Sequence, residues 1–132
     1  NIGDSLTEQT EKRKNIPQTR LKIMMGYIQN NYSKSITLDQ IAGTVSVSKS
    51  TALNIFNEYL HRSPIEYLIE YRLKKAAEML KETELTVETI AYDTGFNNVG
   101  YFCRKFKKAY SMTPSEYRRS GLKYMDIVHN IC

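Results

Sequence analysis

An internal repeat with a period of about 50 residues is the feature that most restricts what this chain can fold into. The matching parts are an Ile-Ala pair, a phenylalanine and a hydroxyl-Pro-x-Glu-Tyr stretch: Ile41-Ala42, Phe56 and Ser63–Tyr67 in the first unit, and Ile90-Ala91, Phe106 and Thr113–Tyr117 in the second. The offset is 49 residues at the front of the unit and 50 at its back, so the second unit holds one additional residue. The sequence therefore predicts two copies of one supersecondary unit.

Each unit is predicted to be a helix-turn-helix. A short helix, a tight turn, a longer helix and a Pro-capped start of a further helix follow one another in both copies. The turns fall at Ser46-Val47 and Gly95-Phe96, where glycine suits a left-handed backbone because it has no Cβ. A plain repeat of helical hairpins is the alternative. The two matched copies of turn, caps and core positions favour the helix-turn-helix.

The fold class is predicted to be all-α: a seven-helix bundle of two helix-turn-helix subdomains joined by a long linker helix. Apolar residues recur at helical spacing, and no alternating apolar and polar run predicts a strand. The predicted helices cover about 18–32, stretches that begin after Thr37 and near Ser48, about 63–81, a stretch after Thr86, about 98–110, and a stretch opened by Thr113-Pro114.

Five segments make up the predicted organisation. They are a flexible linker or arm (1–17) closed by Pro17, a first helix-turn-helix subdomain (18–62), the linker helix (63–81), a second subdomain (82–120) and a C-terminal tail (121–132) with room for a short helix. Because the first residue is Asn1 rather than Met, we expect an effector or dimerisation domain upstream, with residues 1–17 as its tether.

The linker helix has clear start signals and a length that suits DNA. Ser63 is an N-cap, Pro64 sits where a missing N–H is harmless, and Glu66 occupies the capping-box position. Its predicted buried stripe is Ile65, Leu68, Ile69, Leu73, Ala76, Ala77 and Leu80. About 19 residues give roughly 28 Å, close to the about 34 Å between successive major grooves on one face. The helix is expected to place the two units in adjacent grooves, or simply to pack one hairpin on the other.

The net positive charge of the chain comes entirely from its last quarter. The formal net charge is +5, and residues 97–132 carry seven basic against two acidic side chains, whereas residues 1–96 carry twelve of each. A localised basic surface favours a polyanionic partner, here double-stranded DNA. A solubilising charged face is the alternative.

The chain also resembles the AraC-type (AraC/XylS) transcription regulators over about Gln18 to Ser120. The resemblance lies in Ile90-Ala91, Gly95-Phe96, Tyr101-Phe102, Arg104, Phe106–Lys108 and Thr113–Arg118, and in Tyr71–Leu73 with Ala76-Ala77 of the linker helix. It implies a seven-helix C-terminal DNA-binding domain of a bacterial regulator, usually an activator that contacts RNA polymerase, in the cytoplasm and associated with the nucleoid. The sequence departs from the family's common residues at Ala52, Asn54 and Gly100.

The second helix of the first unit supplies one set of predicted DNA-binding residues, because the N-terminal part of a reading helix enters the major groove. The set is Ser48, Lys49, Ser50, Thr51 and Asn54. The resemblance places Ser50 and Asn54 at base-reading positions, where Asn can pair with adenine. Lys49 is expected on phosphate. Leu53 is expected either to touch a thymine methyl or to pack at the helix edge.

The second unit supplies the other set: Asn97, Asn98, Val99, Gly100, Arg104, Lys107 and Lys108. Arg104 can read guanine bidentately, with a surface salt bridge as its alternative. Asn97 is expected to cap its helix or to bind phosphate, and the two lysines are expected on phosphate.

Some further cations and helix ends are also predicted to contact phosphate. They are Arg62, Lys105, Arg118 and the N–H groups at the helix starts Ser63 and Thr113. Arg72 lies beside the buried stripe, so an internal ion pair is expected instead, with Glu58 as its partner.

Two other classes of function are weaker. An enzyme is not expected, since His61 and His129 stand without metal-ligand or triad spacing and no Gly-rich phosphate loop is present. No cofactor or metal is therefore predicted, and Cys103 and Cys132 are read as free thiols. No apolar run approaches the roughly 20 residues of a membrane span. A protein-interaction module remains the second alternative, and duplex binding at two salt concentrations distinguishes it from a DNA reader.

Overall fold

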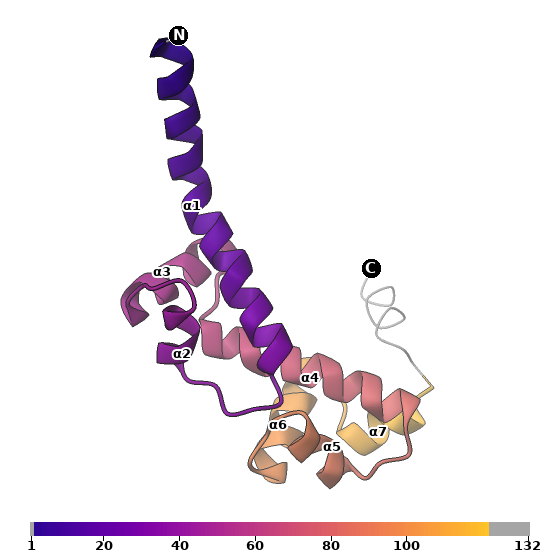
Figure 1. Cartoon of the computed structure of the whole chain (residues 1–132). Helices are drawn as coiled ribbons and strands as arrows, with labels where there is room; N and C mark the ends of the chain where they lie inside the picture. Colours follow the sequence, from indigo (N-terminus) through magenta and orange to yellow (C-terminus); the bar gives the residue numbers. More distant parts are fainter. Residues whose placement is uncertain (1, 122–132) are drawn as a thin grey trace. The chain divides into compact units, whose positions relative to one another are not determined.

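The computed structural model describes residues 2–121, with side chains from residue 15 onward, and the regular elements of this part of the chain are all helices, joined by short turns and loops (Figure 1). Its helices are α1 (Ile2–Asn31), α2 (Leu38–Gly43), α3 (Lys49–Leu60), α4 (Pro64–Glu82), α5 (Val87–Asp93), α6 (Val99–Tyr110) and α7 (Pro114–Arg119). The all-α prediction is confirmed, with seven helices in the described residues. The tail from residue 122 lies outside them, so the short helix considered there stays a prediction.

The first helix begins much earlier than expected. It was predicted to start near Gln18, but α1 starts at Ile2 and contains Pro17 in its interior. Polar, aperiodic composition was read as a linker, yet Glu, Gln, Lys and Arg are good helix formers, and they dominate residues 8–14. A proline inside a helix removes one backbone hydrogen bond and costs about 3 kcal/mol, but here the helix continues on both sides of Pro17. The role of residues 1–17 as a tether stays a prediction.

The chain divides into two compact units. The first holds α1, α2, α3 and the start of α4 as far as Leu68, and the second holds Tyr32–Ser35, α4 from Ile69, and α5 to α7. The long helix thus contributes residues to both units, and the short segment after α1 belongs with the second.

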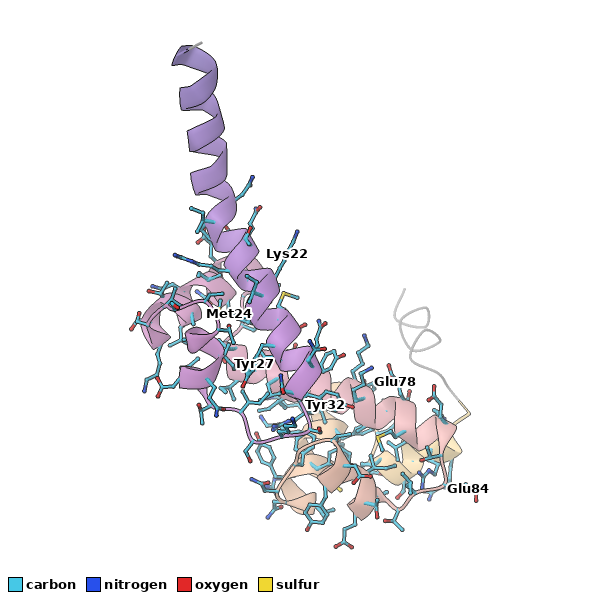
Figure 2. The ribbon with its side chains drawn as sticks, in the orientation of Figure 1. Lys22, Met24, Tyr27, Tyr32, Glu78 and Glu84 are labelled. Atoms are coloured by element: carbon cyan, nitrogen blue, oxygen red, sulfur yellow. The ribbon has the colours of Figure 1, made fainter. Side chains whose placement is uncertain are left out.

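Each unit has its own apolar core. The first is built on Leu21, Met24, Ile28, Ile41, Ala42, Ala52, Ile55, Phe56 and Leu68, all buried. In Figure 2, Met24 points from α1 toward α2 and α3, and the exposed Lys22 points to the other side. The second core joins α4, α5, α6 and α7 through Leu73, Ala76, Ala77, Leu80, Ile90, Ala91, Phe96, Phe102, Phe106 and Tyr117. Ile65 was expected in the buried stripe of α4, but it is 36% exposed.

Hydroxyl caps start several helices as predicted. Thr37 and Thr113 form complete capping boxes with Gln40 and Glu116, and Ser48 caps α3. At the start of α4, the Glu66 amide donates to the Ser63 hydroxyl at 3.1 Å. These caps fix where each helix begins and therefore which residues lie in the first turns of α3 and α6. Within the described residues, no helix is both long and apolar enough to cross a membrane.

Candidate nucleic-acid interface

The two predicted turns are present and share one backbone geometry. Ser46 and Gly95 both have positive φ, +54° and +97°. In each unit the next residue closes the turn onto the preceding helix: Val47 donates to the Ala42 carbonyl at 3.2 Å, and Phe96 to that of Ala91 at 2.9 Å. α2 and α3, and α5 and α6, are therefore two helix-turn-helix units.

The additional residue of the second unit can now be placed. Ser48 caps α3 directly after Val47, whereas Asn97 intervenes between Phe96 and Asn98, which caps α6. The Asn98 side-chain oxygen accepts from the Tyr101 amide at 2.8 Å. The expectation that Asn97 could cap the helix is wrong. Its side chain is exposed and remains a candidate for phosphate contact.

On α3, the predicted base-reading residues lie on the solvent-exposed side of the helix. Ser50 and Asn54 are exposed, and no hydrogen bond or ion pair within the described residues engages either side chain. They are four residues apart, which puts them on one face of the helix. Leu53 is 39% exposed, so packing does not bury it.

The other α3 candidates are partly engaged within the unit. The Ser48 hydroxyl accepts from the Thr51 amide at 3.2 Å and lies 3.0 Å from the Thr51 hydroxyl, and Thr51 is only half-exposed. The Lys49 Nζ lies 3.6 Å from the Asp39 Oδ2, and both side chains are well exposed. An exposed pair of this kind contributes little and does not prevent Lys49 from reaching a phosphate.

On α6, Arg104 occupies the position that Asn54 holds on α3. Both helices have 12 residues and start at their caps, so Asn54 and Arg104 are each the sixth residue of their helix. Arg104 is exposed, and the described residues give it no ion pair. A Cβ on Gly100, one turn earlier, would lie 3.5 Å from the Arg104 guanidinium and 3.1 Å from the capping oxygen of Asn98.

Two residues of α6 differ from expectation. Val99 was placed in the exposed set, but it is partly buried and packs against the core of the second unit. Tyr101 was omitted from that set, yet it is 36% exposed, with the Lys105 ammonium 5.5 Å from its ring centroid. Its position beside the Asn98 cap makes it part of the face that presents Arg104. Tyr101 had been used only as part of the family resemblance and was not considered for the exposed set.

The basic residues of α6 have no counterpart on α3. Lys107 and Lys108 are exposed near the end of α6, and the same positions of α3 carry Asn57 and Glu58, also exposed. The two helices therefore share a scaffold but present different charge.

Arg118 serves the fold. Its guanidinium donates to the carbonyl oxygens of Leu80, Thr83 and Leu85 at 3.0, 3.3 and 2.6 Å, at and just beyond the C-terminal end of α4. Lys81 in turn donates to the Tyr117 carbonyl oxygen at 2.5 Å. Arg118 satisfies carbonyl groups that the C-terminal end of α4 leaves without partners, and Lys81 adds a donor to the Tyr117 carbonyl oxygen, which also accepts from Ser120. The assignment of Arg118 to phosphate is therefore withdrawn.

Arg72 also has backbone partners rather than Glu58. Its Nε donates to the Tyr32 carbonyl oxygen at 2.7 Å, and its Nη2 to that of Lys34 at 2.9 Å. Gly95 approaches this group closely, since a Cβ there would lie 2.5 Å from the Tyr32 oxygen. Burial lowers the pKa of the guanidinium below its ordinary value. Arg72 is engaged within the chain, as expected, but the predicted ion pair with Glu58 is wrong: its partners are backbone carbonyl groups.

Some N–H groups at the helix starts that were expected to bind anions already have hydrogen-bond partners. At α7 the Glu116 amide donates to the Thr113 hydroxyl and the Thr113 amide to the Glu116 carboxylate, both at 3.1 Å. This carboxylate is itself an anion at the helix N-terminus, so it competes with phosphate there. We therefore no longer assign the Thr113 and Glu116 amides to DNA.

His61 and Cys103 have structural positions. His61 is the C-cap of α3 in a left-handed conformation. Cys103 packs against the second core, and burial raises the pKa of its thiol, which lowers its reactivity. Among the described side chains, no group of three or more His, Cys, Asp or Glu is placed to hold a metal ion.

Two helix-turn-helix units in one chain, each with an exposed second helix, define the class of bipartite helix-turn-helix domains. Comparison with known proteins agrees. The helix-turn-helix domain family matches residues 41–120. The chain belongs to this family, in its AraC-type branch.

Three relatives illustrate the match. YdeC, an HTH-type transcriptional regulator of Bacillus subtilis, is 35% identical over 104 residues, which are 79% of this chain and 36% of YdeC. A transcriptional regulator of Chromobacterium violaceum with an AraC-type DNA-binding domain aligns with a TM-score of 0.75 and 27% identity, covering 78% of this chain and 92% of the other. The DNA-binding domain of AdpA, solved with a target DNA, has a TM-score of 0.72 at 19% identity, covers 76% and 90% of the two chains, and shares the fold.

This chain corresponds to one part of longer proteins. It spans about a third of the length of the first curated relatives it matches, namely 36%, 28% and 33%.

Proposed function

We propose that this chain binds double-stranded DNA in a sequence-specific manner through α3 and α6 and thereby regulates transcription. The proposal rests mainly on two exposed positions that are equivalent on the two helices. Ser50 and Asn54 lie one turn apart on α3, and Gly100 and Arg104 lie one turn apart at the same places on α6. Side chains so placed near the start of a helix can reach base edges in a major groove.

The chemistry of these side chains supports a division of tasks between the units. Asn54 suits adenine and Arg104 suits guanine, because each can form two hydrogen bonds with that base. Lys107 and Lys108 suit phosphate, since an ammonium on a flexible stem acts as a point charge without base preference. We therefore expect the second unit to supply more of the salt-dependent affinity and the first unit to read with polar, uncharged groups.

The length of α4 supports a site that spans two grooves. The helix has 19 residues, which correspond to about 28 Å at 1.5 Å per residue. Successive major grooves on one face of DNA lie about 34 Å apart. We propose that the half-sites of α3 and α6 lie one helical turn apart on the same face.

Selection of bound duplexes from a random pool, followed by fluorescence anisotropy, tests this proposal. We expect two short conserved half-sites about 10 base pairs apart. Asn54→Ala should lose preference in one half-site, and Asn57→Ala, an exposed Asn one turn later on α3, is the matched control that should keep it. Binding that is equal for every duplex would overturn sequence reading. No binding to any duplex would instead favour an interaction module.

For the longer protein, we propose a transcription regulator whose effector or dimerisation domain precedes this chain. RNA polymerase is its proposed partner if it activates, its proposed location is the cytoplasm at the nucleoid, and no catalytic role is proposed. A reporter placed downstream of the selected site tests the direction. Higher expression with the protein supports activation, and lower expression supports repression.

A further inference from the structure

The turn before α6 is in close contact with a segment that precedes the first helix-turn-helix unit in the chain. This segment, Tyr32–Ser35, follows α1 directly and belongs with the second unit. Its Tyr32 carbonyl oxygen lies so near the turn that a Cβ on Gly95 would be 2.5 Å from it. The Tyr32 ring also packs edge to face against the ring of Tyr71 on α4, with 5.3 Å between the centroids. The second unit therefore depends on residues from an earlier part of the chain.

Arg72 of α4 holds this segment by its backbone. Its Nε donates to the Tyr32 carbonyl oxygen at 2.7 Å, and its Nη2 to that of Lys34 at 2.9 Å. The same guanidinium lies 6.0 Å from the centroid of the Phe96 ring, and a Cβ on Gly95 would lie 2.7 Å from its Nε. Because a guanidinium is a rigid planar fork of donors, bonds to two carbonyl groups fix its orientation as well as its position. One side chain thus joins α4, the segment and both residues of the turn.

The turn also contacts the start of α6. Phe96 is buried, and its ring lies 5.0 Å from that of Phe102 and 6.2 Å from that of Tyr101, measured between centroids. Both residues belong to the first turn of α6, as does Gly100, and Arg104 lies one turn after Gly100. A binding residue works when its neighbours hold it within about 0.5 Å and 10–20° of the productive geometry. A restraint on Phe96 is therefore also a restraint on the direction in which α6 presents Arg104.

We propose that Arg72 is a positioning residue for base reading by α6. It acts through the segment Tyr32–Ser35 and the Gly95-Phe96 turn, and it contacts no DNA itself. This inference rests on the proposed function, because it assigns to Arg72 a part in the reading by Arg104. It also makes the segment after α1 a support of the second reading helix.

Hydrogen exchange of the free protein tests the restraint on the turn. The Phe96 amide donates to the Ala91 carbonyl oxygen, so its exchange reports opening of the turn. Arg72→Ala should speed this exchange by about tenfold or more, since it removes hydrogen bonds from a charged group. Tyr32→Ala should act in the same direction, and it decides the question if Arg72→Ala does not fold. Lys34→Ala is the matched control, because it removes a side chain and keeps the carbonyl oxygen that Arg72 uses. Unchanged exchange at Phe96, or an equal increase in the control, would overturn the proposal.

Duplex binding tests the effect on reading. The half-site of α6 is the one whose preference Arg104→Ala relaxes. Arg72→Ala should reduce the preference for this half-site by about fivefold or more, the lower end of what one base contact provides, and should change neither the preference for the other half-site nor the salt slope. Arg118→Ala is the control for a general loss of stability. Its guanidinium also bonds backbone carbonyl groups of the second unit, at the end of α4 and not at the turn.

Two results of this binding experiment would overturn the role of Arg72. A salt slope reduced by about one would show that Arg72 contacts phosphate. Equal losses of preference in Arg72→Ala and Arg118→Ala, at a temperature where both are folded, would show that only stability is affected.

The two measurements also separate this inference from the proposed function. Faster exchange at Phe96 together with a weakened preference for one half-site supports both. If the unsubstituted chain has no sequence preference, the proposed function fails, and the role of Arg72 in reading fails with it. If that preference is present and Arg72→Ala keeps it, only the inference on Arg72 is overturned.

Discussion

Replacing Gly95 with alanine tests whether the turn before α6 depends on a close approach of the backbone. Gly95 has φ of +97°, a conformation that a side chain disfavours. A Cβ there would also lie 2.5 Å from the Tyr32 carbonyl oxygen and 2.7 Å from the Arg72 Nε. One of these atoms belongs to the backbone and the other donates a hydrogen bond at 2.7 Å, so neither can move without loss.

The cost can be estimated from two separate effects. Holding a non-glycine residue in this backbone region costs about 1–3 kcal/mol. Displacing the Arg72 guanidinium weakens a hydrogen bond to a charged group, worth about 1.5–3 kcal/mol. Together we expect Gly95→Ala to lower the free energy of unfolding by about 2.5–6 kcal/mol, a large share of the about 5–15 kcal/mol of an ordinary domain.

Thermal and urea unfolding, followed by circular dichroism, measure this loss. Gly26→Ala is the matched control, because Gly26 lies inside α1 and a Cβ there would meet nothing within 4 Å. Alanine is favoured over glycine inside a helix by about 0.5–1 kcal/mol, so the control should raise stability. In an Arg72→Ala background, Gly95→Ala should cost less, since one of the two obstacles is gone.

Two outcomes would refute this reasoning. If Gly95→Ala raises Tm as Gly26→Ala does, the close approach at Gly95 does not affect the free energy of unfolding. If its cost is the same with and without Arg72, the loss comes from the backbone conformation alone, and the contact with Arg72 does not contribute.

Three further predictions follow from the interface. Arg104→Ala should weaken binding to the selected site by about 1–3 kcal/mol and relax one base preference, and an equal loss on random DNA would contradict base reading. Lys107→Ala and Lys108→Ala should weaken binding to all duplexes and each reduce the salt slope by about one, whereas an unchanged slope would show that they face away from phosphate. Hydrogen bonds from the Thr113 amide and hydroxyl lower the pKa of the Glu116 carboxyl group. The stability that the ionised carboxylate contributes is therefore fully present above the ordinary carboxyl pKa, and it is lost as pH falls through the lower pKa of the folded protein. Glu116→Gln should remove this loss in acid, and acid unfolding that is the same in both proteins would contradict it.

Local chemistry explains what could be predicted from the sequence. The cap Thr37 and its partner Gln40 are three residues apart, and a turn such as Gly95-Phe96 is closed within five residues. Such signals need only a short window of sequence. The repeat added further weight, because each local pattern occurred twice at matching positions.

Contacts between distant residues explain most of what could not be predicted. Arg72 and Arg118 were assigned by their charge and neighbourhood, but their partners lie 33 to 40 residues away in the sequence. Those partners are backbone carbonyls, which every residue has, so no residue type marks them. The start of α1 was missed for a different reason: Pro17 was given more weight than the helix-forming residues before it.

The repeat predicts which positions form the core of each unit, but it does not predict which residues occupy the exposed positions. Ile41 and Ile90, or Phe56 and Phe106, are fully buried in both units, so packing restricts them to apolar residues of similar volume. Asn54 and Arg104 occupy equivalent exposed places, where no hydrogen bond or ion pair within residues 2–121 engages their side chains, and they differ in size, charge and base preference. A duplicated unit can therefore keep its fold while its two copies diverge toward two different half-sites. For this reason our proposal for the residues that read the DNA sequence rests on the comparison of equivalent exposed positions rather than on the shared motif.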